Sequence, residues 1–156
     1  MNITLKSVKH NERLSRDSHC FSATVYIDGK KVFGVMDDGW GGEMDTFAVT
    51  GGVKDVDTKY AEIDAVLGKE KCKAPYEDMD NCLEFVVGHL VNEFLRDREI
   101  KKCLRRITYM VGDEMYEVKA KPTPENITKV KAAKWWNPTN VLLNGMPIEN
   151  VRQYFK

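Results

Sequence analysis

The chain has 156 residues, which suits a single domain whose core is large enough to need no disulfide or metal cross-links. Hydrophobic residues make up 42% of it and charged residues 31%, the balance of a water-soluble globular protein. Basic and acidic side chains both total 24, so no overall charge attracts the chain to nucleic acid or to a membrane surface.

The charges are nevertheless segregated along the chain. Residues 1–36 carry 6 basic and 3 acidic side chains (net +3), residues 37–84 carry 5 and 13 (net −8), and residues 85–156 carry 13 and 8 (net +5). The middle third is therefore an acidic block between basic flanks. Two interpretations stay open, a solvated surface without a partner and an electrostatic docking face for a basic one.

No stretch is long and apolar enough for a membrane span, and the N-terminus lacks the apolar segment of a signal peptide. We therefore expect a cytoplasmic protein with no membrane contact. Because the four cysteines are widely spaced, they are expected to be free thiols; they are Cys20, Cys72, Cys82 and Cys103. No close pair of cysteine or histidine residues anchors a zinc site, so no metal site is predicted.

The first elements predicted along the chain are strands. Apolar residues at alternate positions indicate a strand near residues 3–8, and the polar residues 11–18 indicate a loop. The same alternation over 20–36 predicts a hairpin, with its turn at Asp28-Gly29, two residues that tolerate positive φ.

The register of this hairpin stays open. A two-residue turn would pair Val25 with Val32, whereas a three-residue turn would pair Val25 with Phe33. Gly34 in the second strand indicates either a bulge or a close approach of backbone.

The hairpin leads into the most unusual segment, residues 37–45, with the sequence DDGWGGEMD. Its glycines indicate backbone conformations that other residues resist. The acidic side chains would repel a phosphate, and the lysine of a phosphate-binding loop is missing. Carboxylates can hold a divalent cation, but their order does not match a calcium-binding loop.

Three interpretations of this loop stay open: a structural turn with Trp40 packed over the sheet edge, a binding loop, and a metal site. We favour a binding loop in which Trp40 is an exposed anchor. The predicted binding residues are Asp37, Asp38, Gly39, Trp40, Gly41, Gly42, Glu43 and Asp45.

The remaining elements follow from periodicity, glycines and prolines. They are a short strand at 47–49, a helix at 55–67, a charged connector at 69–76, a long helix that ends near 105, a hairpin at 106–119, a helix that begins at Pro124, a short strand at 141–143 and a terminal helix at 147–155. Asp78 or Asp80 is expected to cap the long helix. Its apolar stripe is Leu83, Val86, Val87, Leu90, Val91 and Phe94.

These elements predict an α+β fold in one domain over residues 1–156. A mainly antiparallel sheet, built from the two hairpins, should pack against the long helix and two or three shorter ones. Basic residues gather at 101–106, where they complement the helix dipole. No stacking aromatic side chains are interleaved with them, so direct nucleic-acid binding is not expected.

The segment from Cys20 to Gly42 resembles a family of small, largely uncharacterised proteins of bacteriophages and prophages. In that family a Cys-Phe-x-Ala strand leads into Tyr-x-Asp-Gly-Lys and then into an (Asn/Asp)-Gly-x-Gly-Gly loop. The likeness is looser at 106–119 and 141–144, and residues 53–80 do not match. The resemblance implies where the protein acts but no chemical reaction. It implies a phage accessory protein in the cytoplasm of its bacterial host, acting on host or anti-phage defence proteins.

Two functions compete at this point. The first is a binding protein that modulates, most simply inhibits, a host or defence protein through the acidic block and residues 37–45. The alternative is a small-ligand protein that binds, sequesters or cleaves a nucleotide in a pocket beside that loop. The sequence contains no nucleophile–base pair, metal-ligand spacing or cofactor fingerprint, so no catalytic residue, metal or cofactor is predicted. The oligomeric state stays open.

Overall fold

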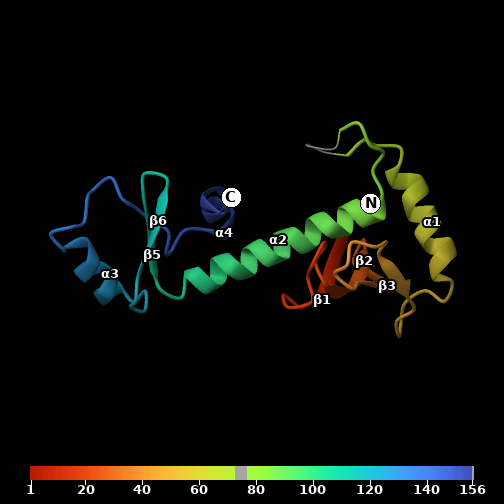
Figure 1. Ribbon diagram of the computed structural model, residues 1–156, viewed down its shortest axis with the longest axis horizontal. Helices are drawn as coiled ribbons and strands as arrows, with labels where there is room; N and C mark the ends of the chain where they lie inside the picture. The colour runs from red at the N-terminus through yellow and green to blue at the C-terminus, as the bar shows by residue number, and fades with distance from the viewer. Residues whose placement is uncertain (73–76, 156) are drawn as a thin grey trace. The chain divides into compact units, whose positions relative to one another are not determined.

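The computed structural model describes residues 1–72 and 77–155. They form two compact units, Met1–Asn92 and Glu93–Lys156, and each unit has its own antiparallel sheet (Figure 1). The long helix α2 (Leu83–Cys103) supplies residues to both units. The α+β class is confirmed, and the two predicted hairpins exist. They lie in two different sheets, however, where one shared sheet was expected; the single domain stays a prediction.

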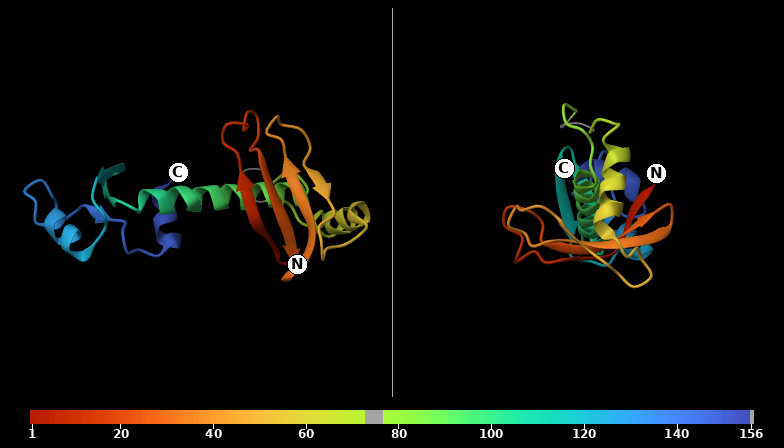
Figure 2. Two further views of the ribbon diagram at one scale, coloured as in Figure 1. Left: turned by 90° about the horizontal axis from the view of Figure 1, so that it is seen from below. Right: turned by 90° about the vertical axis from the view of Figure 1, so that its right-hand side faces the viewer.

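The first unit is built on a four-stranded sheet in the order β1 (Ile3–His10), β2 (Phe21–Ile27), β3 (Lys30–Asp37) and β4 (Asp45–Phe47). Alternation along β2 buries one face of that strand, and β3 buries the continuous run from Val32 to Val35. Figure 2 shows α1 (Val56–Leu67) and the first half of α2 on one side of it. The buried residues of this core are Phe21, Ala23, Val25, Val32, Phe33, Val35, Ile63, Leu83, Val87 and Val91.

The β2–β3 hairpin combines features of both registers. Its turn has two residues, Asp28 and Gly29, with φ of 47° and 78°, and Ile27 pairs with Lys30 across it. A bulge follows, because Val32 has no partner and Val25 therefore pairs with Phe33.

Gly34 lies two residues beyond this bulge, and the group that approaches it closely is a side chain and not the expected backbone. A Cβ atom at Gly34 would lie 2.3 Å from the ring of Phe47, so a close approach requires the glycine.

Helix α1 has the predicted bounds, with Asp55 as its N-cap and Gly68 at its C-cap. The start of α2 was predicted wrongly: the helix begins at Leu83, and neither Asp78 nor Asp80 caps it. The carboxylate of Asp64, on α1, accepts a hydrogen bond from the Leu83 amide at 2.7 Å. Asp80 instead pairs with Lys71 at 2.6 Å. The cap thus comes from another helix and not from the residues just before α2.

The apolar stripe of α2 also needs correction. Leu83, Val87 and Val91 are fully buried, as expected, but Leu90 is half-buried and Phe94 is 38% exposed. Part of the connector at 69–76 falls on residues 73–76, outside the described residues. None of the helices that the structure describes is long and apolar enough to cross a membrane.

The second unit has a three-stranded sheet in the order β6 (Glu114–Val118), β5 (Ile107–Val111) and β7 (Val141–Leu142). Helix α3 (Pro124–Lys131) begins as predicted, with Thr123 as its N-cap. The chain ends in α4 (Ile148–Val151) and the 3₁₀ turn η1 (Arg152–Tyr154). The core on one side of this sheet contains Ile100, Met110, Leu143 and Val151.

Candidate functional site

Residues 37–42 are folded against the loop that joins β1 to β2. The carbonyl oxygen of Gly39 accepts hydrogen bonds from three successive amides: those of Arg16 at 2.9 Å, Asp17 at 3.0 Å and Ser18 at 3.4 Å. Successive amides of this kind can hold an anion. Here they hold a carbonyl of the same chain, so the contact fixes one loop on the other.

The first two acidic side chains of the segment help to build it. The Asp37 carboxylate accepts hydrogen bonds from the Ser18 hydroxyl and from the Gly39 amide, both at 2.7 Å. The Asp38 carboxylate accepts one from the Trp40 amide at 3.0 Å. Bonds from Asp to an amide two residues on are typical of tight turns. These two carboxylates therefore shape the loop besides carrying charge.

The three glycines of the segment differ in whether another residue could replace them. Gly39 has a φ of 89°, and a Cβ atom there would lie 2.3 Å from the carbonyl oxygen of Leu14. Gly41 has a φ of 78°, and a Cβ atom at Gly41 would lie 3.1 Å from the Cβ of Asp17. Gly42 has neither a positive φ nor a close neighbour. Two of the three glycines are thus required by the docking of the two loops.

Trp40 stands out from this loop. Its side chain is 64% exposed, so it is not packed over the sheet edge. The guanidinium carbon of Arg16 lies 5.4 Å from the centre of its ring, a cation–π distance. Glu43 is exposed as well, and Asp45 is the first residue of β4, where it pairs with Met36. A binding role for residues 37–45 stays a prediction.

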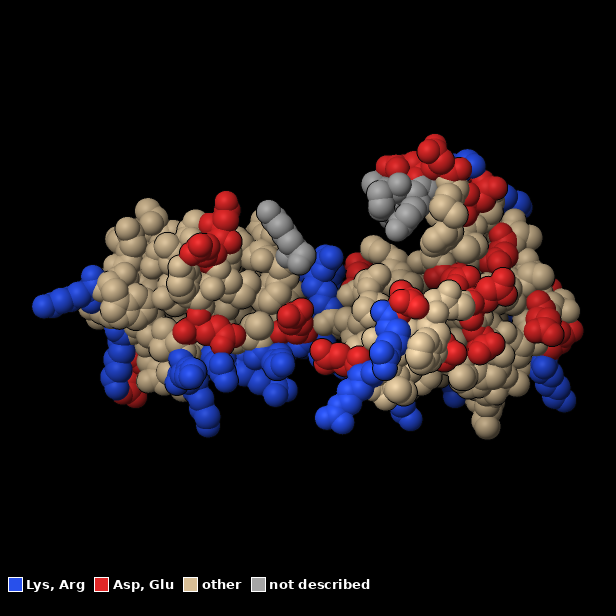
Figure 3. Space-filling model, viewed as in Figure 1, with Lys and Arg blue, Asp and Glu red and all other residues tan. Residues whose placement is uncertain are grey.

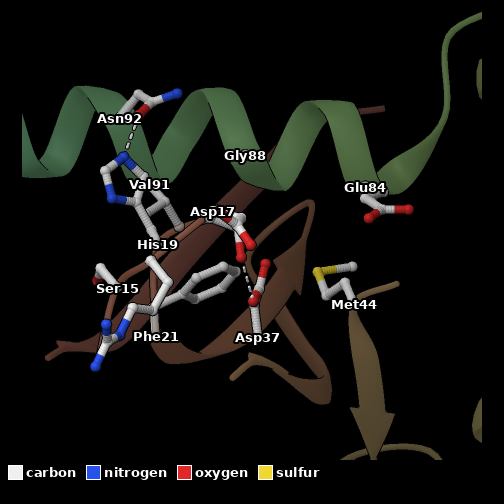
Figure 4. A pocket seen from close by; sticks show the side chains of 12 residues that line it. Ser15, Asp17, His19, Phe21, Asp37, Met44, Glu84, Gly88, Val91 and Asn92 are labelled. Atoms are coloured by element: carbon white, nitrogen blue, oxygen red, sulfur yellow. Dashed lines mark hydrogen bonds between the residues drawn. The ribbon is translucent and has the colours of Figure 1, made fainter. Parts of the chain in front are cut away.

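A cavity of about 460 Å³ lies beside the loop (Figure 4). Its apolar wall consists of Phe21, Met44 and Val91. The charged and titratable residues that line it are three acidic ones, Asp17, Asp37 and Glu84, together with Arg16 and His19. On the helix side it is bounded by Gly88 of α2, where a Cβ atom would meet nothing within 4 Å. Figure 4 shows Asp17 and Asp37 below Gly88, with Glu84 and Met44 on one side and His19 on the other.

A second hollow adjoins the first, since both are lined by Met44 and Glu84. Its other residues include Glu43, Asp57 and Tyr60. Burial, and then the negative charges of neighbouring carboxylates, raise the pKa of Tyr60 to about 12. At neutral pH its phenol is protonated, as that of any tyrosine is, and can donate a hydrogen bond. Together the two hollows suit a cationic group and disfavour a phosphate.

Sequence reasoning found the loop but missed its partners. Ser18 and Asp17 lie about 20 residues before it and Glu84 lies far beyond it, and no local pattern marks any of the three. All four cysteines are free, as predicted. Among the described residues no group of three or more histidine, cysteine or acidic side chains is arranged to hold a metal ion.

No protein-family model, curated protein or solved structure matches the chain. The resemblance to the phage family therefore stays a prediction.

Proposed function

We propose that the protein binds a basic surface of a partner protein through residues 37–45 and the hollows beside them. The observation that carries the proposal is Trp40, whose ring is 64% exposed on a loop held by hydrogen bonds from residues 16–18. Tryptophan is enriched among the residues that dominate binding energy at interfaces. A loop that is already ordered loses little conformational entropy on binding, so more of the contact energy becomes affinity.

The charge of the first unit favours a basic partner. Residues 1–92 contain 11 basic and 16 acidic side chains, a net charge of −5. Figure 3 shows acidic side chains spread over the face of this unit around α1 and the start of α2. The negative electrostatic potential of these side chains steers a basic protein towards the surface and disfavours the binding of an acidic protein.

The cavity fits a lysine or arginine side chain of that partner. The aliphatic stem of such a side chain would lie against Phe21 and Val91, and its charged end would reach the carboxylates of the rim. Arginine is among the residues enriched at binding hot spots, which lie in well-packed pockets that exclude water.

For the setting, we infer a phage accessory protein that acts in the bacterial cytoplasm and inhibits a host or anti-phage defence protein. This inference is supported by the resemblance of residues 20–42 to the phage family. The alternative of a nucleotide ligand has weaker support, because Asp17, Asp37 and Glu84 would face its phosphates. A nucleotide that copurified with the protein, detected by its ultraviolet absorbance, would reverse this preference.

A double variant, Glu43→Gln with Asp45→Asn, tests the proposed charge complementarity. Both carboxylates are exposed, so the variant should melt like the parent. Capture of the partner from host lysate by the immobilised protein should fall roughly 3- to 10-fold at low salt, since the steering charge is reduced. The difference should vanish near 1 M salt, where the screening length is about 3 Å.

The matched control is Glu62→Gln with Glu70→Gln, which removes the same net charge from exposed positions on and after α1. Capture by this control should stay within about twofold of the parent, because only nearby charges escape screening. Equal losses in the two double variants, or no loss in either, would contradict a local role for the loop.

A further inference from the structure

The second unit carries a cluster of aromatic side chains on one face of its sheet. Tyr109 of β5 is at its centre. The Tyr116 ring is stacked on it, with centres 5.8 Å apart and planes at 23°. The rings of Trp135 and Trp136 lie 5.8 Å and 5.1 Å from Tyr109. Both tryptophans follow the end of α3, so helical geometry does not force them to opposite sides.

This cluster is only partly a core. Tyr109 is 8% exposed, whereas Tyr116 is 43% and Trp135 is 54% exposed. Side chains alternate along β5, so Tyr109 points away from the core that its neighbour Met110 joins. Two large accessible rings, Tyr116 of β6 and Trp135 of the segment after α3, therefore lie beside the buried ring of Tyr109.

Basic residues lie close to these aromatic residues in the sequence. Residues 93–156 contain 13 basic and 8 acidic side chains, a net charge of +5. In Figure 3 basic side chains project from the lower border of this unit. Four exposed lysines flank the aromatic segments: Lys119 and Lys121 after β6, and Lys131 and Lys134 before Trp135. None of the four forms an ion pair with any acidic side chain that the structure describes.

The acidic side chains of β6 are already engaged. Glu117 pairs with Arg106 at 2.9 Å, and Glu114 accepts a hydrogen bond from the Tyr116 hydroxyl. Arg106 thus offsets the charge of Glu117, whereas Glu114 keeps its negative charge and is oriented by the Tyr116 hydroxyl.

We propose that the face formed by Tyr109, Tyr116 and Trp135 binds single-stranded nucleic acid. Unpaired bases stack on the rings of Tyr116 and Trp135, and the flanking lysines contact the phosphates. Proteins that bind single strands combine a basic surface with exposed aromatic side chains in this way. A duplex fits less well, because its bases are stacked on one another and offer no free ring face. The basic residues at 101–106 have no interleaved aromatic side chains in the sequence, which is why nucleic-acid binding was not expected; the proposal rests instead on the aromatic cluster of residues 109–136 and the lysines near it in the sequence.

The test is the fluorescence anisotropy of a labelled oligothymidine titrated with the full chain at low salt. We expect binding that weakens with added salt, and weaker binding of a duplex of the same length. Trp135→Ala should raise the Kd by roughly 5- to 150-fold, the effect of losing one stacked base. Trp40→Ala removes an exposed tryptophan from the acidic unit and should leave this Kd unchanged.

A second variant, Lys131→Gln with Lys134→Gln, alters only exposed side chains and leaves the aromatic packing intact. It should flatten the plot of log K against log salt by about 0.7 for each phosphate that a lysine no longer neutralises. Circular dichroism establishes that each variant is folded. The proposal is overturned if the oligothymidine does not bind, if duplex binds as tightly, or if folded Trp135→Ala binds like the parent. Binding to anionic lipid vesicles without binding to the oligonucleotide also overturns it and assigns the face to a membrane surface.

Discussion

Val87→Asp is expected to unfold the Met1–Asn92 unit. Val87 is 0% exposed on the stripe of α2 that also includes Leu83 and Val91. A carboxylate there would be buried without a partner, which costs several kcal/mol. Domains of this size are stable by only about 5–15 kcal/mol. Far-UV circular dichroism should show loss of strand signal, and amide hydrogen exchange should show loss of protection in β2 and β3.

Leu90→Asp is the matched comparison, three residues further along the same helix. Leu90 is half-buried, so a carboxylate at this position reaches water and should cost clearly less. A Val87→Asp protein that melts like the parent would show that this face of α2 does not cover the sheet. A Leu90→Asp protein less stable than Val87→Asp would mean that the buried stripe is misplaced.

Gly39→Ala is expected to lower the free energy of unfolding by roughly 2–4 kcal/mol and to displace the loop that carries Trp40. The residue combines a φ of 89° with a position where a methyl group would lie 2.3 Å from the Leu14 carbonyl oxygen. The loop must move to relieve this clash, and the three hydrogen bonds to the Gly39 carbonyl then break or lengthen. Chemical denaturation measures the cost, and faster hydrogen exchange of the amides of residues 16–18 reports the displacement.

Gly42→Ala provides the control within the same loop. A Cβ atom at Gly42 meets nothing within 4 Å, and the residue has no positive φ. Its replacement should change the free energy of unfolding by less than about 1 kcal/mol. The change should be stabilising if the only effect is a lower conformational entropy of the unfolded chain. Similar losses for Gly39→Ala and Gly42→Ala would contradict the docking of residues 37–42 on residues 14–18.

Elements whose signals are local were predicted from the sequence. Asp28-Gly29 marks its turn because both residues accept positive φ, and Thr123 with Pro124 marks the start of α3. The pattern of α2 indicated a long helix and roughly where it ends, but not where it begins, because its cap is Asp64 on another helix. The division into two sheets was not predicted either, since the alternation of a hairpin does not specify its neighbours.

In the candidate site too, features with a local signal were predicted and contacts between distant residues were not. The composition of 37–45 marked an unusual backbone, and Gly39 and Gly41 do adopt positive φ. The reason for Gly39 lies at Leu14, and the bond that fixes Asp37 comes from Ser18. Contacts of this kind depend on how two loops pack, and no periodicity encodes them. The same limit applies to the aromatic cluster, whose four rings come from two strands and from the segment after α3.

The most direct test of the proposed recognition surface is Trp40→Ala, measured by both thermal unfolding and capture of the partner that the parent protein binds. Because the side chain is 64% exposed, its removal should change the free energy of unfolding by less than about 0.5 kcal/mol. As an interface anchor it should weaken partner binding by about 2 kcal/mol, roughly 30-fold. Lower stability with unchanged affinity would contradict the account and make Trp40 a packing residue.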